Sequence, residues 1–152
     1  MIVIASDHAG VELKSHLVEL VRAQGLDIKD LGPGDTSSVD YPDFAHAVAA
    51  AVASSEADLG ILICGTGIGM SLAANRHPGV RAALCHDAFT AEMARVHNDA
   101  NVLCVGARVT GGGVVEQMVE IFLNTDFEGG RHERRLSKIS ALEATACGSR
   151  SA

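Results

Sequence analysis

Residues 59–69 read Leu-Gly-Ile-Leu-Ile-Cys-Gly-Thr-Gly-Ile-Gly. The first six form a continuous apolar run, which is typical of a strand buried on both faces of a parallel sheet. The three glycines that follow predict a tight turn that leads into a short helix over 67–75. The stretch therefore predicts a strand–loop–helix unit of an α/β fold.

The same alternation continues on both sides of this stretch. Short apolar runs predict further strands at 2–5, 27–31, 80–85 and 102–105. Apolar residues at helical spacing, with start and stop signals, predict helices at 13–21, 42–54, 87–96 and 114–123. Five consecutive βα units predict a Rossmann-like three-layer αβα sandwich with a five-stranded parallel sheet.

A further helix is predicted over 131–142, outside the five units. Because it is extra to the sandwich, this C-terminal helix is a candidate for packing on a partner subunit. We predict a single domain over 1–145 and a disordered tail over 146–152, since the tail has little to bury.

Composition excludes several classes of protein. The 152 residues are 47% apolar and only 3% aromatic, with no apolar run of about 18 residues that could span a membrane. The formal net charge of −7 argues against a nucleic-acid partner or a membrane surface, since both favour a broad basic face. The four cysteines form no C-x-x-C pair, so free thiols in a reducing, cytoplasmic compartment are expected.

Reactive residue types follow the predicted strands. Ligands bind beyond the carboxyl ends of the strands in an open α/β sheet. Those ends carry Asp7-His8, Cys64-Gly65-Thr66, His86-Asp87 and Gly106-Ala107-Arg108. We therefore expect the chemistry at this edge of the sheet.

Cys64 is the strongest candidate among these residues. A thiol at a strand end, followed by glycines and a helix start, faces several backbone N–H groups that can hold an anionic oxygen and favour the thiolate. An inert packed cysteine is the alternative, and it is the interpretation that we adopt for Cys85 and Cys104. Met70 stands where a dinucleotide-binding loop needs its third glycine and where a cysteine phosphatase needs arginine.

Two other groups have simpler alternatives. His97-Asn98-Asp99 follows a helix and precedes a strand, so it should lie at the amino edge of its own sheet and reach an active site only in a neighbouring subunit. It could equally be an ordinary helix C-terminus, where a histidine interacts favourably with the helix dipole. Arg131 and Arg135 lie one turn apart on the final helix, either as a solvated basic face or as a phosphate site. The histidines and cysteines show no metal-ligand spacing, so no metal is expected.

Taken together, these segments resemble the type B ribose-5-phosphate isomerases, a family that also includes galactose-6-phosphate isomerase subunits. The matching stretches, in the family's order, are Asp7-His8-Ala9-Gly10, Asp40-Tyr41-Pro42, Ile63 to Gly69, Ala74-Asn75, His97 to Leu103, Gly106-Ala107-Arg108 and Glu128 to His132. The resemblance implies an aldose–ketose isomerase of a small sugar phosphate that needs no cofactor. It also implies a homodimer, or a dimer of dimers, with active sites shared between subunits.

The resemblance also implies a role for each site residue. Cys64 would be the base that moves the proton, His97 would open the furanose ring, and Thr66 would assist. The enediolate oxygens would be held by the loop formed by Gly65, Thr66, Gly67, Ile68 and Gly69. Sugar hydroxyls would be bound by Asp7, His8 and Asn98, and the phosphate by Arg108, Arg131 and Arg135.

Two alternatives remain open. The same chemistry could act on galactose 6-phosphate, allose 6-phosphate or a tetrulose phosphate instead of ribose 5-phosphate. A non-catalytic phosphosugar-binding module would keep the fold and the arginines but would use Cys64 only for packing.

Overall fold

The computed structural model describes residues 1–148, with side chains described up to residue 143. Its strands are β1 (Ile2–Ser6), β2 (Ile28–Asp30), β3 (Leu59–Cys64), β4 (Ala82–Leu84) and β5 (Val102–Gly106). Its helices are α1 (Val11–Ala23), α2 (Tyr41–Ala53), α3 (Ile68–Ala74), α4 (Ala88–Asn98), α5 (Gly112–Asn124) and α6 (Arg131–Gly148). The predicted order of strands and helices is confirmed.

All five strands form one parallel sheet in the order β2-β1-β3-β5-β4. β3 lies at the centre and pairs with β1 on one side and β5 on the other, with Cys64 opposite Gly106. The last five residues of β3 are buried, as its continuous apolar sequence predicts.

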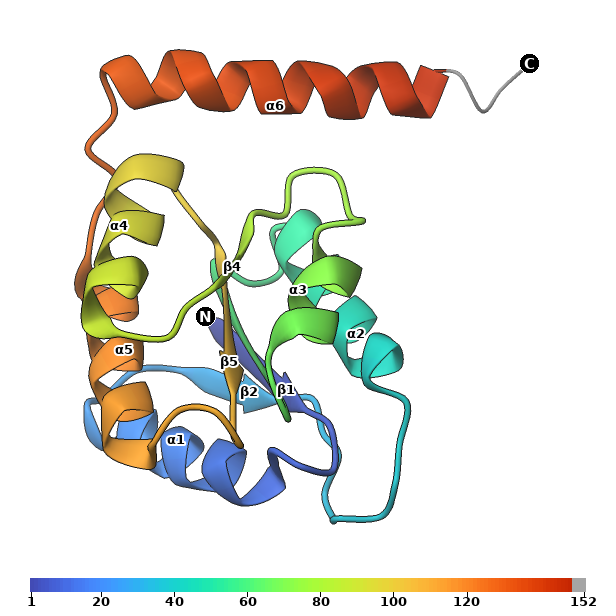
Figure 1. The fold of residues 1–152 in the computed structure, drawn as a ribbon, viewed down its shortest axis with the longest axis vertical. Helices are drawn as coiled ribbons and strands as arrows, with labels where there is room; N and C mark the ends of the chain where they lie inside the picture. Colours follow the sequence, from blue (N-terminus) through green and yellow to red (C-terminus); the bar gives the residue numbers. More distant parts are fainter. Residues whose placement is uncertain (149–152) are drawn as a thin grey trace.

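Two helical layers cover the sheet, which confirms the predicted three-layer sandwich (Figure 1). One core lies under α1, α4 and α5, and the other lies under α2 and α3. Few aromatic residues lie between the helices and the sheet, and the small residues there allow close packing. A methyl group added at Gly60 would lie 2.6 Å from Val48 Cγ1, so α2 packs directly against the backbone of β3.

The fourth strand is shorter than the apolar run 80–85 predicts. Val80 is held in a turn, because its N–H donates to the carbonyl of His77. Asn75 then fixes the start of the strand, since its side chain both donates to and accepts from the backbone of Ala82, at 2.9 Å each. The side chain of Asn75 therefore determines where β4 begins, and this boundary cannot be predicted from the hydrophobic periodicity.

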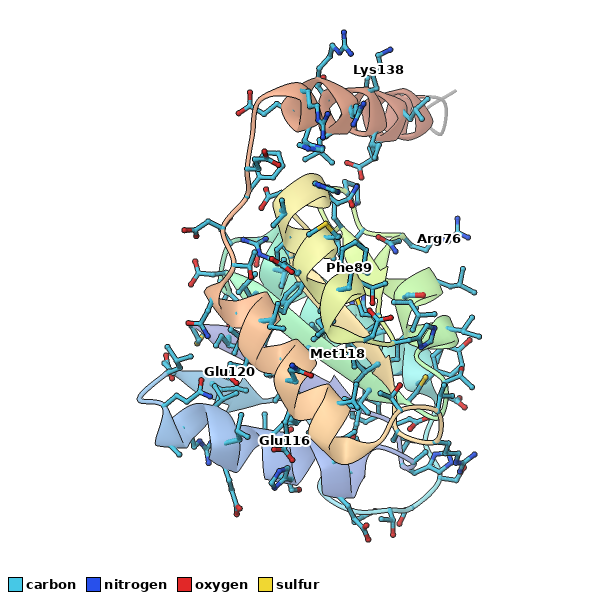
Figure 2. All side chains as sticks on the ribbon, turned by 60° about the vertical axis from the view of Figure 1, so that its left-hand side comes forward. Arg76, Phe89, Glu116, Met118, Glu120 and Lys138 are labelled. Atoms are coloured by element: carbon cyan, nitrogen blue, oxygen red, sulfur yellow. The ribbon has the colours of Figure 1, made fainter. Side chains whose placement is uncertain are left out.

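Helix α6 lies outside the sandwich, across one end of the molecule (Figure 1). Its contacts with the body are few: it meets the end of α4, and Glu143 accepts a hydrogen bond from the N–H of Gly79 at 3.1 Å. Lys138 projects from it away from the body (Figure 2), whereas Met118 of α5 is fully buried. The predicted tail at 146–152 begins within α6, and residues 149–152 lie outside the described residues.

Within the described residues, no helix combines the length and the apolar character needed to cross a membrane.

Candidate active site

The strand order places a topological switch point at the carboxyl ends of β1 and β3. The helix that follows β1 packs on one face of the sheet, whereas the helix that follows β3 packs on the other, so the two connections diverge. Asp7 and His8 follow β1, and Cys64 ends β3. The N–H of Asp7 donates to the carbonyl of Ile63 at 2.9 Å, which holds the two strand ends side by side.

The loop after β3 folds back over Cys64. The N–H of Gly67 donates to Cys64 Sγ at 3.0 Å, and only 5% of Cys64 is exposed. Gly67 has a φ of +79°, and a methyl group there would lie 2.5 Å from Leu84 Cδ1. Glycine is therefore required for the turn that aims this N–H at the sulfur.

Three more backbone donors of this loop face no acceptor. Within residues 1–148, the N–H groups of Gly65, Thr66 and Gly69 make no hydrogen bond. A strand end followed by a short helix leaves such donors unpaired, and they can bind an anionic oxygen. The hydroxyl of Thr66 accepts weakly from Ile68 N–H at 3.4 Å, so it too is available.

Side chains from the neighbouring strands surround the loop. Asp7 is buried, and one of its carboxylate oxygens accepts from the N–H of Ala9 at 2.9 Å. His8 Nδ1 accepts from the N–H of Val39 at 3.4 Å, which orients the ring. The exposed Arg108 lies beside Gly65, where an added methyl group would be 3.6 Å from its Nη1. The structure thus brings together a carboxyl-edge group, which consists of Asp7, His8, Cys64, Thr66, the loop glycines and Arg108.

The other predicted residues lie at the opposite edge of the sheet. His97 and Asn98 end α4, shortly before the start of β5. The N–H of Gly60, near the start of β3, donates to the carbonyl of Asn101, which places this segment at the amino edge. β3 separates the two edges by about 20 Å. His97 therefore does not meet Cys64 within one chain, as its place in the sequence predicts.

Helix α6 adds its arginines at this amino edge. The ring of His132 stacks on that of His97 with centroids 4.4 Å apart, and Arg131 Nε lies 3.4 Å from His132 Nε2. Burial lowers the pKa of His132, and the nearby His97 and Arg131 lower it further. Arg135 lies one turn further along α6. His97, Asn98, Arg131, His132 and Arg135 form an amino-edge group.

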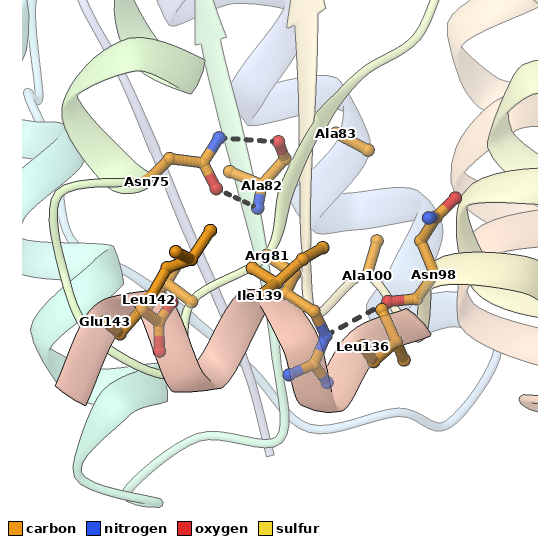
Figure 3. A pocket seen from close by; sticks show the side chains of 11 residues that line it. Asn75, Arg81, Ala82, Ala83, Asn98, Ala100, Leu136, Ile139, Leu142 and Glu143 are labelled. Carbon is orange, nitrogen blue, oxygen red and sulfur yellow. Dashed lines mark hydrogen bonds between the residues drawn. The ribbon is translucent and has the colours of Figure 1, made fainter. Parts of the chain in front are cut away.

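A partly buried ion-pair network holds the amino-edge group in place. Asp99 caps α4 in the left-handed conformation, with a φ of 43°. Its carboxylate accepts from Arg81 at 2.7 Å and from Arg95 at 3.0 Å. Arg81 also donates to the backbone carbonyl of Asn98 at 3.0 Å (Figure 3). The end of α4 is therefore fixed before any ligand binds.

Sequence reasoning assigned no role to two residues in or beside these groups. The ring of Tyr41 lies against Gly69, where an added methyl group would be 2.7 Å from two of its ring carbons. His132 is buried, with 4% exposed. Both residues stand in stretches that carry the family resemblance, Asp40-Tyr41-Pro42 and Glu128 to His132. Their presence in these stretches is the sequence signal that points to both residues.

One cluster places possible metal ligands close together. Ligand atoms of His97, Glu128 and His132 lie within 4.8 Å of one another. The two rings are nearly parallel, at 14°, so their in-plane lone pairs cannot converge on one ion without rotation of a ring. Arg131 also donates towards His132 Nε2, and Arg135 adds a second positive charge. The arrangement favours an anion over a cation.

A cavity of about 480 Å³ separates α6 from the body (Figure 3). Leu136, Ile139 and Leu142 line its α6 side, and small apolar residues of the β4 region line the other. It includes Asn98 but no residue of the carboxyl-edge group. The chemistry at Cys64 therefore lies outside this cavity.

Comparisons with known proteins find similar sequences. The sequence model of the ribose/galactose isomerase family matches residues 2–139. Ribose-5-phosphate isomerase B of Escherichia coli is 43% identical over 142 residues, which cover 93% of this chain and 95% of that protein.

Solved structures are similar over almost the whole chain. Ribose-5-phosphate isomerase B of Clostridium thermocellum matches with a TM-score of 0.94 and 46% identity, over 95% of this chain and 98% of that one. The enzyme of Mycoplasma genitalium, solved with bound ribulose-5-phosphate, matches with a TM-score of 0.91 and 47% identity, over 94% and 95% of the two chains.

Proposed function

This chain belongs to the ribose/galactose isomerase family and is an isomerase, and from that premise we propose that it interconverts ribose 5-phosphate and ribulose 5-phosphate. Two relatives that match more than nine-tenths of it carry the name ribose-5-phosphate isomerase B, and a third was solved with ribulose-5-phosphate. The carboxyl-edge group offers the parts that this reaction requires.

In the proposed reaction the Cys64 thiolate removes the proton from C2 of the open-chain aldose. The electron pair of that C–H bond forms the C1–C2 double bond, and negative charge develops on O1. Unpaired N–H groups of Gly65, Thr66 and Gly69 stabilise this enediolate. The proton then returns to C1, while the hydrogen on O2 moves to O1 and leaves the ketone at C2. No oxidant or reductant is needed.

A single observation carries this assignment. Cys64 Sγ accepts the Gly67 N–H at 3.0 Å beside a row of unpaired donors. Cys104, on the adjacent strand, is in a different environment. It is completely buried, and this burial raises the pKa of its thiol. Burial likewise raises the pKa of Cys85 to about 11. Cys64 is therefore the described cysteine best placed to act as the base.

The proposal includes a shared active site in a homodimer or a dimer of dimers. Within one chain the carboxyl-edge group lacks the ring-opening histidine, and the amino-edge group lacks a base. A partner that brings its amino-edge group over the carboxyl-edge group would complete both. His97 would then open the furanose, Asn98 would bind a hydroxyl, and the arginines would bind the phosphate together with Arg108. Cys64, Cys85 and Cys104 are free thiols, which fits a cytosolic setting.

The experiment is an isomerase assay across four-, five- and six-carbon sugar phosphates, with Cys64→Ser and Cys85→Ser tested beside the native chain. We expect the highest kcat/KM on ribose 5-phosphate, with turnover lost in Cys64→Ser and kept in Cys85→Ser. Preference for galactose 6-phosphate, allose 6-phosphate or a tetrulose phosphate would overturn the substrate. Binding without turnover in the native chain would indicate a phosphosugar-binding module.

A further inference from the structure

Two histidines far from the proposed active site meet at the surface. His46 lies on α2, and His77 lies in the segment between α3 and β4. His46 Nδ1 is 2.7 Å from His77 Nε2, and the ring planes are inclined by 39°. The ring of His46 is exposed and that of His77 is half-buried, so both nitrogens are reachable from solvent.

The neighbours of His77 determine where the protons lie. His77 Nδ1 is 3.3 Å from the carbonyl oxygen of Ala74, which can only accept, so Nδ1 carries the hydrogen. His77 Nε2 therefore presents a lone pair towards His46, which donates from Nδ1. A ligating histidine in a metal site typically donates its other N–H to a backbone carbonyl in the same way.

We propose that His46 and His77 form a two-histidine site for a divalent transition metal of the zinc, nickel and copper class. Imidazole nitrogens suit these ions, and water would complete the coordination. Two nitrogens bound to one tetrahedral ion at about 2.0–2.1 Å stand about 3.3 Å apart. The distance between the two nitrogens must widen by about 0.6 Å from its present 2.7 Å, and the exposed His46 ring must rotate so that Nδ1 turns away from His77 Nε2 and faces the ion.

Metal binding here needs no net proton release from neutral rings. The hydrogen on His46 Nδ1 leaves, and one from solvent attaches to His46 Nε2, so that Nδ1 offers its lone pair to the ion. The nearest charges in the sequence, Asp43 one turn earlier on α2 and Arg76 beside His77, are opposite in sign. The site therefore differs from the His97, Glu128 and His132 cluster, whose stacked rings and arginines oppose a cation.

A metal at this position would link two segments that support the catalytic loop. α2 begins at Tyr41, whose ring lies against Gly69 in the first turn of α3. His77 follows α3 and is tied to it through Ala74. An ion bound by both histidines would hold α2 and the end of α3 together, and it would stabilise the folded chain by mass action.

The test titrates the full-length protein with Ni²⁺, by calorimetry and by thermal unfolding, in a buffer without chelators. We expect one ion per chain at this site, and a rise in Tm of about 5–10 °C at a hundred times the dissociation constant. His46→Ala should weaken binding at least about tenfold, since loss of a ligand costs no less than loss of an outer partner. Alanine is well tolerated at this exposed helical position, so the variant should fold.

Two control variants make the result decisive. His86→Ala removes another exposed imidazole. Glu128→Gln removes one possible ligand of the His97, Glu128 and His132 cluster. Both variants should bind Ni²⁺ like the native chain. Absence of binding up to millimolar Ni²⁺, or unchanged affinity in His46→Ala, would overturn the proposal. Loss of the same binding event in Glu128→Gln would also overturn it. None of these readouts depends on isomerase activity.

Discussion

The carboxyl-edge group and the amino-edge group differ in how their residues are held. At the carboxyl edge, backbone geometry does most of the positioning: Gly67 aims its N–H at Cys64, and the strand ends bring Asp7 alongside. At the amino edge, side chains position the group, through the ion pairs of Asp99 and the stacking of His132 on His97. One group offers a thiol and a loop of backbone N–H donors, and the other offers imidazoles and cations. Neither is a complete isomerase site, which is why we propose that two chains share one.

The largest expected effect is a loss of kcat on substitution of Cys64, the proposed base. Cys64→Ala should lower kcat by about 10³-fold or more, because removal of a general base costs about 10²–10⁴-fold. Affinity for the sugar phosphate should change only a few-fold. Steady-state kinetics and equilibrium binding measure the two quantities, with Cys85→Ala as the control. If Cys64→Ala keeps a tenth of the native kcat, the base is another residue.

The amino-edge arginines should affect affinity more than chemistry. Arg135→Ala should raise KM for the sugar phosphate about ten- to a hundredfold, which corresponds to about 1.5–3 kcal/mol for a charged hydrogen bond. Arg134→Ala changes a neighbouring cation of the same helix and should have little effect. The comparison uses the phosphorylated and the free sugar. An unchanged preference for the phosphorylated sugar in Arg135→Ala would place the phosphate elsewhere.

His97 should affect kcat more in one direction of the reaction than in the other. Ribose 5-phosphate is mainly a closed furanose, whereas ribulose 5-phosphate cannot form that ring, because its O5 carries the phosphate. His97→Ala should therefore lower kcat for the aldose about tenfold or more and lower kcat for the ketose less, while kcat/KM falls by one factor in both directions, because the equilibrium constant fixes that ratio. Rates at saturating substrate in both directions test this. Equal losses of kcat in the two directions would assign His97 to proton transfer or binding instead.

The smallest effect compares cysteines within one chain. Cys85 has its pKa raised to about 11 by burial, so it stays protonated and unreactive at pH 7–9. Iodoacetamide at pH 7.5 should therefore modify Cys64 at least about tenfold faster than Cys85. Peptide mass spectrometry of a time course gives both rates, and the rate at Cys85 should rise only as pH approaches 11. Faster modification of Cys85 would contradict the role of the glycine loop.

Much of this arrangement could be predicted from the sequence, because it depends on local signals. The βα alternation follows from apolar periodicity, and the edge positions of Cys64 and His97 follow from their places after a strand and after a helix. The strand order and the short β4 could not be predicted in this way, since Asn75 clamps Ala82 through side-chain contacts. The role of Tyr41 against Gly69 depends on how α2 packs, which periodicity does not specify.

Contacts between residues that are distant in sequence could not be predicted for the same reason. His46 and His77 are 31 residues apart, and His97 and His132 come from different helices. Their spacing matches no ligand or catalytic pattern, and only the fold makes them neighbours. The sequence predicts that the C-terminal helix is extra to the sandwich, but the position of this helix across the end of α4 depends on a few contacts at its two ends.

Mixing two inactive variants tests most directly whether the two edges form one active site across chains. Cys64→Ala lacks the proposed base and His97→Ala lacks the proposed ring-opening histidine, so each should be slow on ribose 5-phosphate alone. In an exchanged heterodimer, one of the two shared sites has both residues intact. We predict that activity rises on mixing, towards a quarter of the native value, because about half of the randomly paired dimers are mixed and each has one intact site. If subunit exchange is verified and activity stays at the level of the separate variants, the shared site is contradicted.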